Sequence, residues 1–226
     1  MTAIDLYYVI LAILVLSFFL EKTLEYLNAR CLTDVPPQEL SDIYEPSEYK
    51  KSQEYSRTNY KFGRITSTIS FCVTLVFLNL GGFEHVDLFA RENGDGSILI
   101  ALIFFGVIMF GGELISVPFS YYSTFVIEER FGFNRSTGKI FFSDMLKGWV
   151  LSALFGSLII SAIILLYEYL GQDFWIYAWG LVTAFSVVVN LLYSSIIVPL
   201  FNKQTSLEDG ILKDQISDYA VKVGFD

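Results

Sequence analysis

The sequence predicts an all-α protein, a polytopic transmembrane helical bundle, from its composition and from the length of its apolar runs. Of 226 residues, 54% are hydrophobic and 17% are charged, whereas an ordinary soluble domain has about 45–50% apolar and about 25% charged residues. The mean hydropathy of +0.52 agrees with this class. Helices are expected because each satisfies its own backbone hydrogen bonds in lipid. Five runs are each close to the roughly 17–25 residues that cross a bilayer: 4–20, 65–80, 97–120, 148–170 and 174–200.

The first run, residues 4–20, is predicted to be a retained membrane span. The competing interpretation is a signal peptide, but no basic region precedes the run and no small-residue cleavage site follows it. We expect the helix to continue as a polar extension to about Arg30.

Residues 21–64 form a polar connector that Pro36-Pro37 interrupts and in which Pro46-Ser47 opens a second helix. This second helix is predicted over 47–60, with polar and charged side chains on more than one face. We interpret it as a solvated amphipathic helix that lies on the bilayer surface.

The basic residues support this division into spans and predict an orientation. The connector 21–64 has seven Lys and Arg residues, the next connector has one, the connector 121–147 has four, the turn after Leu170 has none, and the tail has three. Because positive charge collects on the cytoplasmic side, the N-terminus is predicted outside, with both basic connectors and the C-terminal tail in the cytoplasm. The net charge of −9 argues against nucleic acid as a partner, so membrane lipid is the expected surroundings.

A dense polar and aromatic passage separates the third and fourth runs. Residues 124–137 read Thr-Phe-Val-Ile-Glu-Glu-Arg-Phe-Gly-Phe-Asn-Arg-Ser-Thr. Surface connectors often carry function, so we predict a functional loop within 121–147. Its phenylalanines supply apolar anchors, and Gly132 permits close backbone approach or a positive φ, which favours an element folded back against the mouth of the bundle. The alternative is that Glu128, Glu129 and Arg130 form an ordinary solvated charge run.

This passage resembles the signature of the integral-membrane CAAX prenyl protease family, type 1, whose members are zinc metalloproteases. The similarity rests on Thr-Phe-x-Ile-Glu-Glu, then Gly-Phe-Asn, and a threonine three residues after the asparagine. A looser match contains Pro36-Pro37 with Glu39-Leu40 and continues as Tyr49-x-Lys51-Ser52-x-x-Tyr55. A third match lies at 193–203. The resemblance thus covers nearly the whole chain.

The resemblance implies that residues 1–200 are the N-terminal membrane domain of such a protease and that 201–226 begin its cytosolic zinc domain. Intact members cleave a peptide bond near the C-terminus of prenylated or other membrane-delivered substrates, inside a chamber walled by the membrane helices. The signature passage would flank the active site, and Glu128 and Asn134 would contact the catalytic domain or the peptide backbone. The candidate residues of this loop are Thr124, Glu128, Glu129, Gly132, Phe133 and Asn134.

The catalytic centre of such an enzyme cannot be assembled from this chain. A zinc hydrolase of this kind needs H-E-x-x-H on a helix, with two imidazoles for the ion and a glutamate as general base. The chain has one histidine, His85. It could form a weak metal site with Glu84 and Asp87, or be a solvated loop histidine. We predict no catalytic or metal-ligating residue here, so zinc belongs to the intact protein and residues 1–226 alone should be inactive.

Two polar residues lie inside predicted spans and are candidates for facing an internal chamber. Glu113 follows two glycines in the third run, and an ionisable group at membrane depth is expected to avoid lipid. It could line an aqueous chamber or be a carboxylate near the membrane interface. Asn190, in the fifth run, could donate a hydrogen bond to another helix or contact substrate.

The tail is predicted to contain one amphipathic helix. Ser206, with an acid three positions later, offers an N-cap, apolar residues then recur at helical spacing from Ile211, and Gly224 can end the helix. Because the chain stops directly after this glycine, we expect it to be a piece of a longer protein. The alternative function is a non-catalytic membrane scaffold or binding module. A small transporter would require an internal repeat or paired discontinuous helices, and neither is found.

Overall fold

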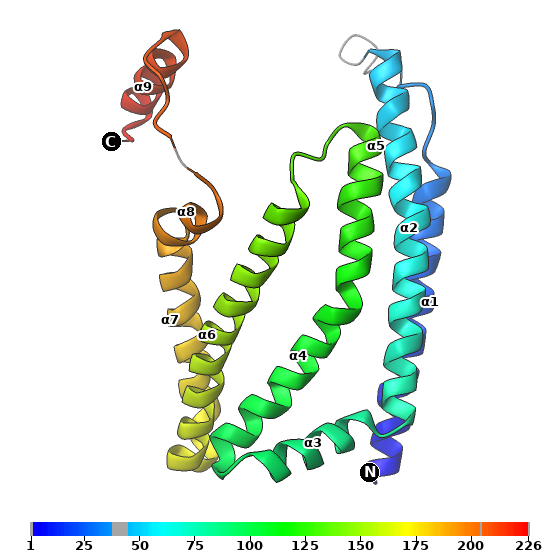
Figure 1. Ribbon diagram of the computed structural model, residues 1–226, viewed down its shortest axis with the longest axis vertical. Helices are drawn as coiled ribbons and strands as arrows, with labels where there is room; N and C mark the ends of the chain where they lie inside the picture. Colours follow the sequence, from blue (N-terminus) through cyan, green and yellow to red (C-terminus); the bar gives the residue numbers. More distant parts are fainter. Residues whose placement is uncertain (1, 38–44, 204, 226) are drawn as a thin grey trace. The chain divides into compact units, whose positions relative to one another are not determined.

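The computed structural model describes residues 2–37, 45–203 and 205–225, which form helices joined by short turns, with no strand among them (Figure 1). Four described helical segments are long and apolar enough to cross a membrane: Ile4–Arg30, Pro46–Asn79, Gly96–Phe131 and Gly138–Phe201. The last of these holds the fourth and fifth predicted runs. The all-α class is therefore confirmed. The chain divides into two compact units, Met1–Phe141 and Phe142–Asp226, and each is described by itself.

Helix α1, Ala3–Arg30, begins at a capping box. The Thr2 hydroxyl accepts a hydrogen bond from the Asp5 N–H at 3.2 Å, and the Asp5 carboxylate accepts one from the Thr2 N–H at 2.7 Å. The helix includes the first apolar run and its polar continuation, so the predicted extension to Arg30 is confirmed. Pro36-Pro37 lies outside any helix, as expected, whereas Glu39-Leu40 lies outside the described residues.

Helix α2, Pro46–Asn79, corrects the interpretation of the first connector. It begins at Pro46, as predicted, but it continues without a break through Arg64 into the second apolar run. The predicted surface helix at 47–60 is therefore the polar first half of a membrane-spanning helix. Charged residues favour helix as much as many apolar ones do, so the end of the polar sequence does not end the helix.

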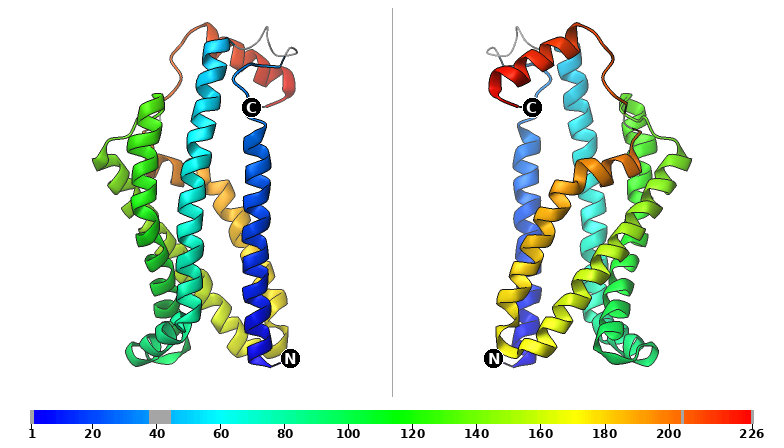
Figure 2. Two further views of the ribbon diagram at one scale, coloured as in Figure 1. Left: turned by 90° about the vertical axis from the view of Figure 1, so that its right-hand side faces the viewer. Right: turned by 90° about the vertical axis from the view of Figure 1, so that its left-hand side faces the viewer.

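Helices α1 and α2 lie side by side and antiparallel, as the views in Figures 1 and 2 show. Near the middle, the rings of Phe18 and Phe71 are stacked with centroids 4.0 Å apart. At one end, the Tyr7 hydroxyl donates to Asn79 Oδ1 at 3.1 Å. At the other end, the Arg57 guanidinium donates to the Leu32 carbonyl at 2.9 Å and pairs with Asp34. Contacts along the whole length thus define the hairpin.

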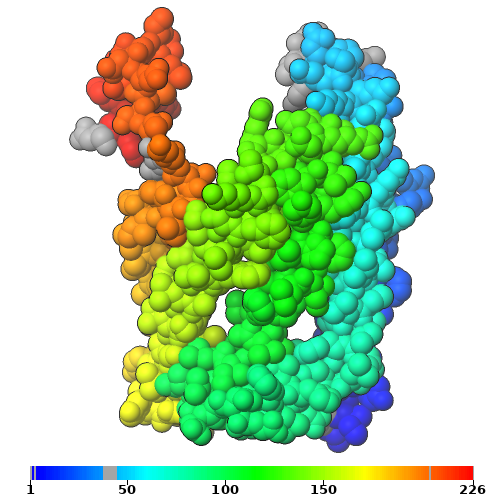
Figure 3. All heavy atoms as spheres, viewed as in Figure 1, coloured from blue at the N-terminus to red at the C-terminus, as the bar shows by residue number. Residues whose placement is uncertain are grey.

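Helix α3, Gly82–Asn93, replaces the loop that was expected around His85. Gly81 supplies the left-handed turn that starts it, with φ of 66°. Within α3, the side chain of Ala90 is fully buried. The ring of Phe83 lies 5.0 Å from that of Phe77 in α2 and 6.3 Å from that of Phe104. An apolar groove of about 470 Å³ remains where α2, α3 and α4 meet, visible as a hollow in Figure 3.

Helix α4, Gly96–Tyr122, does not end where the third apolar run ends. It passes directly into a π-helix, Ser123–Glu128, and then into the short helix α5, Glu129–Phe131. Pro118 lies inside α4 and removes one backbone donor, which favours a bend, and α4 is bent in Figure 1. The predicted loop at 121–147 is therefore wrong for most of its length: only 132–137 is non-helical before α6 begins.

The second unit contains a helical hairpin. Helix α6, Gly138–Leu170, whose first residues belong to the first unit, is joined by a 3-10 turn, Gly171–Asp173, to α7, Phe174–Leu192. Phe155 of α6 and Phe185 of α7 meet edge to face with ring centroids 5.6 Å apart.

Helix α7 continues into a second π-helix, Tyr193–Ile197, and then into α8, Val198–Phe201. The Lys147 ammonium of α6 lies 5.5 Å from the centre of the Phe201 ring, a cation–π contact that joins α8 to α6. The third family-like stretch, 193–203, is therefore helical to Phe201.

The tail helix α9, Ile211–Val223, begins later than predicted. Its N-cap is Gly210 rather than Ser206, which lies in a non-helical segment. The predicted end is confirmed, because Gly224 adopts φ of 73° and the Phe225 N–H donates to the Ala220 carbonyl at 2.9 Å.

The corner between α2 and α3 generates a stability prediction. A Cβ atom on Gly82 would overlap the Phe77 ring, which is itself packed on Phe83. Gly82→Ala should therefore lower the free energy of unfolding in detergent by roughly 1–3 kcal/mol, the usual cost of overpacking. Gly106→Ala is the matched control, since its Cβ would meet nothing within 4 Å. Thermal unfolding followed by circular dichroism should show a lower Tm for the first variant only, and equal Tm values would contradict this packing.

Candidate functional site

The candidate site is the end of α4, where the signature residues form a π-helix and a short α-helix. A π-helical hydrogen bond spans one more residue than an α-helical one. The extra residue rotates the side chains that follow around the helix axis. Ile127 and Phe131, one on each side of the junction, are both buried, with 3% and 4% of their surface exposed. Among the described residues, only Ala90 joins them in the buried hydrophobic class. Apolar side chains of the signature are therefore packed, whereas Glu129 and Arg130 are exposed, as the alternative of a solvated charge run expects.

Tyr55 of α2 is the partner of this helix end. Its ring lies edge to face against Phe131, with centroids 5.2 Å apart, and against Phe133, with centroids 4.9 Å apart. About two turns further along α2, the ring of Phe62 stacks on that of Tyr122, with centroids 5.1 Å apart. Edge-to-face and offset rings are the favoured aromatic geometries. The polar half of α2 thus holds the signature in place.

Gly132 ends the helix in the left-handed conformation, with φ of 80°. The N–H groups of Phe133 and Asn134 both donate to the Glu128 carbonyl, at 2.9 and 3.3 Å, and the Gly132 N–H donates to the Glu129 carbonyl at 3.1 Å. This is a Schellman-type closure, which requires a residue that accepts positive φ. The predicted role of Gly132 as a positive-φ position is confirmed.

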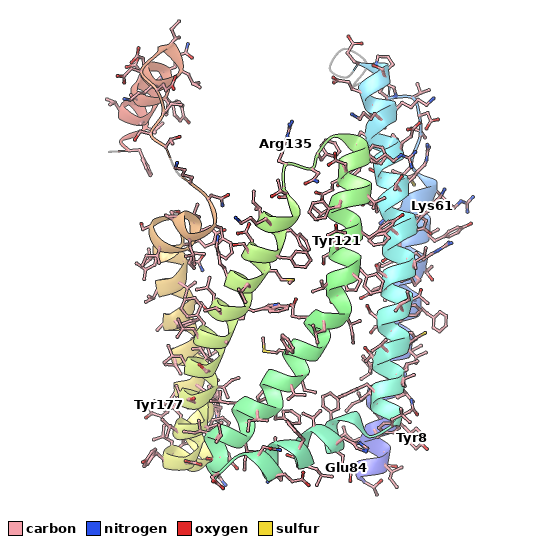
Figure 4. The ribbon with its side chains drawn as sticks, viewed as in Figure 1. Tyr8, Lys61, Glu84, Tyr121, Arg135 and Tyr177 are labelled. Carbon is pink, nitrogen blue, oxygen red and sulfur yellow. The ribbon has the colours of Figure 1, made fainter. Side chains whose placement is uncertain are left out.

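Asn134 organises the turn that follows. Its Nδ2 donates to the Glu129 carboxylate at 2.9 Å, and its Oδ1 accepts from the Ser136 N–H at 2.7 Å. The Thr137 hydroxyl then accepts from the Ile140 N–H at 3.4 Å, the arrangement of an N-cap for α6. Arg135 projects from this turn, and Tyr121 lies on the preceding helix α4 (Figure 4). The turn is thus held by its own polar side chains.

The predicted loop residues take different positions in this arrangement. Thr124 and Glu128 are half-buried in the π-helix, Asn134 is half-buried in the turn, and Glu129, Gly132 and Phe133 are exposed. The structure brings Glu129 and Asn134 into contact, and it uses the carbonyl of Glu128 to close the helix. Contacts of Glu128 and Asn134 with a catalytic domain stay predictions.

Tyr55 and Phe62 were not chosen from the sequence as site residues. Tyr55 was nevertheless the last residue of the looser family match, so the signal was present. It was overlooked because an isolated aromatic residue in a polar helix is compatible with any amphipathic surface. A second aromatic group includes Phe125, one of the predicted apolar anchors: the ring centroids of Tyr121, Phe125 and Phe141 lie 4.6 to 5.8 Å apart.

Glu113 and Asn190, the two candidate chamber-facing residues, are both exposed. Glu113 is exposed on α4, and Asn190 is exposed on α7. Asn190 Nδ2 donates to the Ser186 carbonyl of its own helix at 2.9 Å, so the expected bond to another helix is not observed. Asn190 does share a groove of about 600 Å³ along α7 with Thr183 and Ser186. A chamber-facing role for either residue stays a prediction.

The described residues do not fit a zinc ion. No group of three or more His, Cys, Asp and Glu side chains able to hold a metal occurs among them. His85 Nδ1 lies 2.9 Å from the Gly81 carbonyl, and Asp87 accepts from Arg91 Nε at 2.7 Å. The weak metal site considered for His85, Glu84 and Asp87 is thus not assembled, and no catalytic step is derived for this chain.

Comparison with known proteins gives consistent matches. A family model described as the N-terminal part of CAAX prenyl proteases, with five membrane helices, matches residues 25–203. The probable CAAX prenyl protease 1 of Schizosaccharomyces pombe is 34% identical over 207 residues, 86% of this chain and 44% of that protein. The CAAX prenyl protease 1 homolog of Homo sapiens is 31% identical over 200 residues, 85% of this chain and 42% of that protein.

A solved structure extends the similarity to the fold. The crystal structure of S. mikatae Ste24p matches with a TM-score of 0.90 and 31% identity, covering 97% of this chain and 52% of that one. The chain therefore spans about half the length of the proteins it matches. The family model describes five membrane helices, and its match over 25–203 includes four of the five apolar runs, because the run 4–20 precedes the matched residues.

The closure at Gly132 generates a second stability prediction. A side chain at φ of 80° is strained, so Gly132→Ala should cost about 1–2 kcal/mol of unfolding free energy and loosen the turn. Gly148→Ala is the control, because Gly148 lies inside α6 with nothing within 4 Å of an added Cβ. Limited proteolysis in detergent should cut Gly132→Ala faster than wild type within 132–137, and an unchanged cutting rate would contradict a strained glycine position.

Proposed function

Because the chain belongs to the CAAX prenyl protease family, we propose that it is the N-terminal membrane domain of a zinc metalloendopeptidase. The intact protein would hydrolyse a peptide bond near the C-terminus of prenylated, membrane-associated substrates. Zinc and its ligands would lie on polypeptide outside residues 1–226, since the described residues contain no group able to hold the ion. The part played by this chain is then to house the substrate and to position the catalytic domain.

The observation that carries this proposal is the packing of the signature on α2. Ile127 and Phe131 are buried, and Phe131 and Phe133 enclose Tyr55, in a chain whose other helix faces are largely exposed. The Glu129 carboxylate, the Asn134 amide and the Arg135 side chain sit on this packed base at the surface. A polar turn held on a rigid base is suited to orient a neighbouring domain.

We further propose that the membrane helices line a chamber for the substrate. Glu113 and Asn190 are the candidate chamber-facing residues. The reason is that an ionisable or amide side chain at membrane depth is expected to avoid lipid. Glu128 is half-buried at the signature and forms no salt bridge within the part of the chain that the structure describes. Its carboxylate therefore stays available to a domain or peptide that docks there.

The basic connectors support an orientation with the N-terminus outside and the signature turn and tail in the cytoplasm. This places the docking turn on the side where prenylated cytosolic substrates would arrive. The exposed cysteine Cys31 follows α1 on the predicted cytoplasmic side.

The functional proposal is tested in the full-length protein with a prenylated peptide. Tyr55→Ala removes the ring that joins Phe131 to Phe133, and should lower kcat/KM about tenfold, as expected when a catalytic group is displaced slightly. Tyr55→Phe keeps the ring and should retain activity. Zinc content, measured by mass spectrometry, should be unchanged in both variants.

Two further outcomes decide the proposal. Wild-type activity should be abolished by a chelator and should be absent from purified residues 1–226. Chelator-sensitive cleavage by residues 1–226 alone would contradict the assignment of zinc to other polypeptide. A full-length protein without any peptidase activity would favour the alternative function, a membrane scaffold.

Orientation is tested by thiol labelling in sealed cells. In a Cys72→Ser background, Cys31 should react with a membrane-impermeant maleimide only after permeabilisation, because it is predicted to face the cytoplasm. A matched variant, Cys31→Ser with Cys72→Ser and Glu92→Cys, carries its thiol on α3 and should react in intact cells. The opposite pattern would reverse the predicted orientation.

A further inference from the structure

A groove between α1 and α2 combines a basic end with apolar walls. It has a volume of about 420 Å³, and its walls include Phe18 and Phe19 of α1 and Ile65 and Ile69 of α2. Lys22 of α1 and Arg64 of α2 also line it and are its two charged residues. The two cations come from helices that run in opposite directions, so only the hairpin brings them to one place.

These two cations mark the edge of the apolar sequence on both helices. The first apolar run ends just before Lys22, and the second begins just after Arg64. Stacking of Phe18 on Phe71 holds the two helices in this register. Basic residues at such a boundary place their charges at the level of lipid headgroups. The groove therefore runs from the headgroup level into the hydrocarbon.

The basic groups retain capacity to bind an anion. The Lys22 ammonium contacts Glu25 at 2.6 Å and lies 5.7 Å from the Phe18 ring centre, and an ammonium has three donors. The Arg64 guanidinium lies 5.8 Å from the Tyr60 ring centre and forms no salt bridge among the described residues. The carboxylate of Glu25 does not line the groove.

The remaining polar group in the wall is already satisfied. The Thr68 hydroxyl donates to the Arg64 carbonyl at 2.7 Å, so its hydrogen is already used within α2 and is not offered to a ligand in the groove. Below the two cations the groove is thus effectively apolar. A ligand that fits must carry a negative charge at one end and a hydrocarbon chain at the other.

We propose that this groove is a specific site for an anionic phospholipid. The phosphate is bound by Lys22 and Arg64, and one acyl chain lies along the groove walls formed by Phe18, Ile65 and Ile69. A zwitterionic phospholipid carries its own ammonium, which competes with these two side chains for the phosphate, so an anionic headgroup is preferred. The site does not depend on the proposed peptidase function.

The test uses purified residues 1–226 in detergent, titrated with phosphatidylglycerol or phosphatidylcholine and examined by native mass spectrometry. Wild type should retain phosphatidylglycerol more strongly than phosphatidylcholine. The double variant Lys22→Gln and Arg64→Gln should bind phosphatidylglycerol about 25-fold more weakly, since each basic residue at an anionic lipid surface contributes about a fivefold factor.

The matched control is Lys50→Gln with Lys51→Gln, which removes two charges from the polar half of α2, well away from the groove. It should bind phosphatidylglycerol like wild type. Circular dichroism establishes that each variant is folded, and if the double variant is not, Arg64→Gln alone should weaken binding about fivefold. Equal loss in both double variants, or no loss in either, would overturn the site. Displacement of the phospholipid by a farnesylated peptide would also overturn it, because the groove would then hold a prenyl chain.

Discussion

The contact of Tyr55 with Phe131 and Phe133 is the interaction on which the arrangement of the candidate site depends. Membrane helices gain little from apolar contact alone, because lipid tails are equally apolar. Well-oriented aromatic pairs still contribute about 0.5–1.5 kcal/mol each beyond the area they bury. Here two such pairs join distant parts of the chain at one point. Because Phe131 is the last residue of α5 and Phe133 follows the Gly132 closure, the contacts with Tyr55 fix both sides of this closure against α2.

The apolar runs could be predicted because lipid selects for long uninterrupted hydrophobic helices. The start of α2 at Pro46 and the end of α9 at Gly224 could be predicted because local backbone chemistry sets them. The continuation of α2 through Arg64 and of α4 beyond Tyr122 could not. A change from apolar to polar residues marks where a helix leaves the hydrocarbon, but not where its hydrogen bonds stop. Charged residues and Ser are adequate helix formers, so a change to polar sequence does not by itself end a helix.

Both of the more specific family-like stretches contain a π-helix, at Ser123–Glu128 and Tyr193–Ile197. Such segments are rare, and they are frequent at functional sites because the extra residue redirects the side chains that follow. The sequence carries no local rule for them, since a π-turn costs backbone hydrogen-bond quality that only tertiary contacts offset. At the first, packing on Tyr55 supplies that contact. At the second, the contact comes from the Phe201 ring, which packs against the Lys147 ammonium of α6.

The polar residues of the signature hold the turn after α5 in its shape. Asn134 bonds Glu129 and the Ser136 backbone, and Thr137 caps α6, so the turn forms from its own side chains. It needs no second domain to take this shape. A surface that is ordered before docking loses little conformational entropy on docking, which strengthens the association and fixes its geometry. The charged and amide groups on this turn therefore take their position from these hydrogen bonds and from the aromatic contacts of Tyr55 with Phe131 and Phe133.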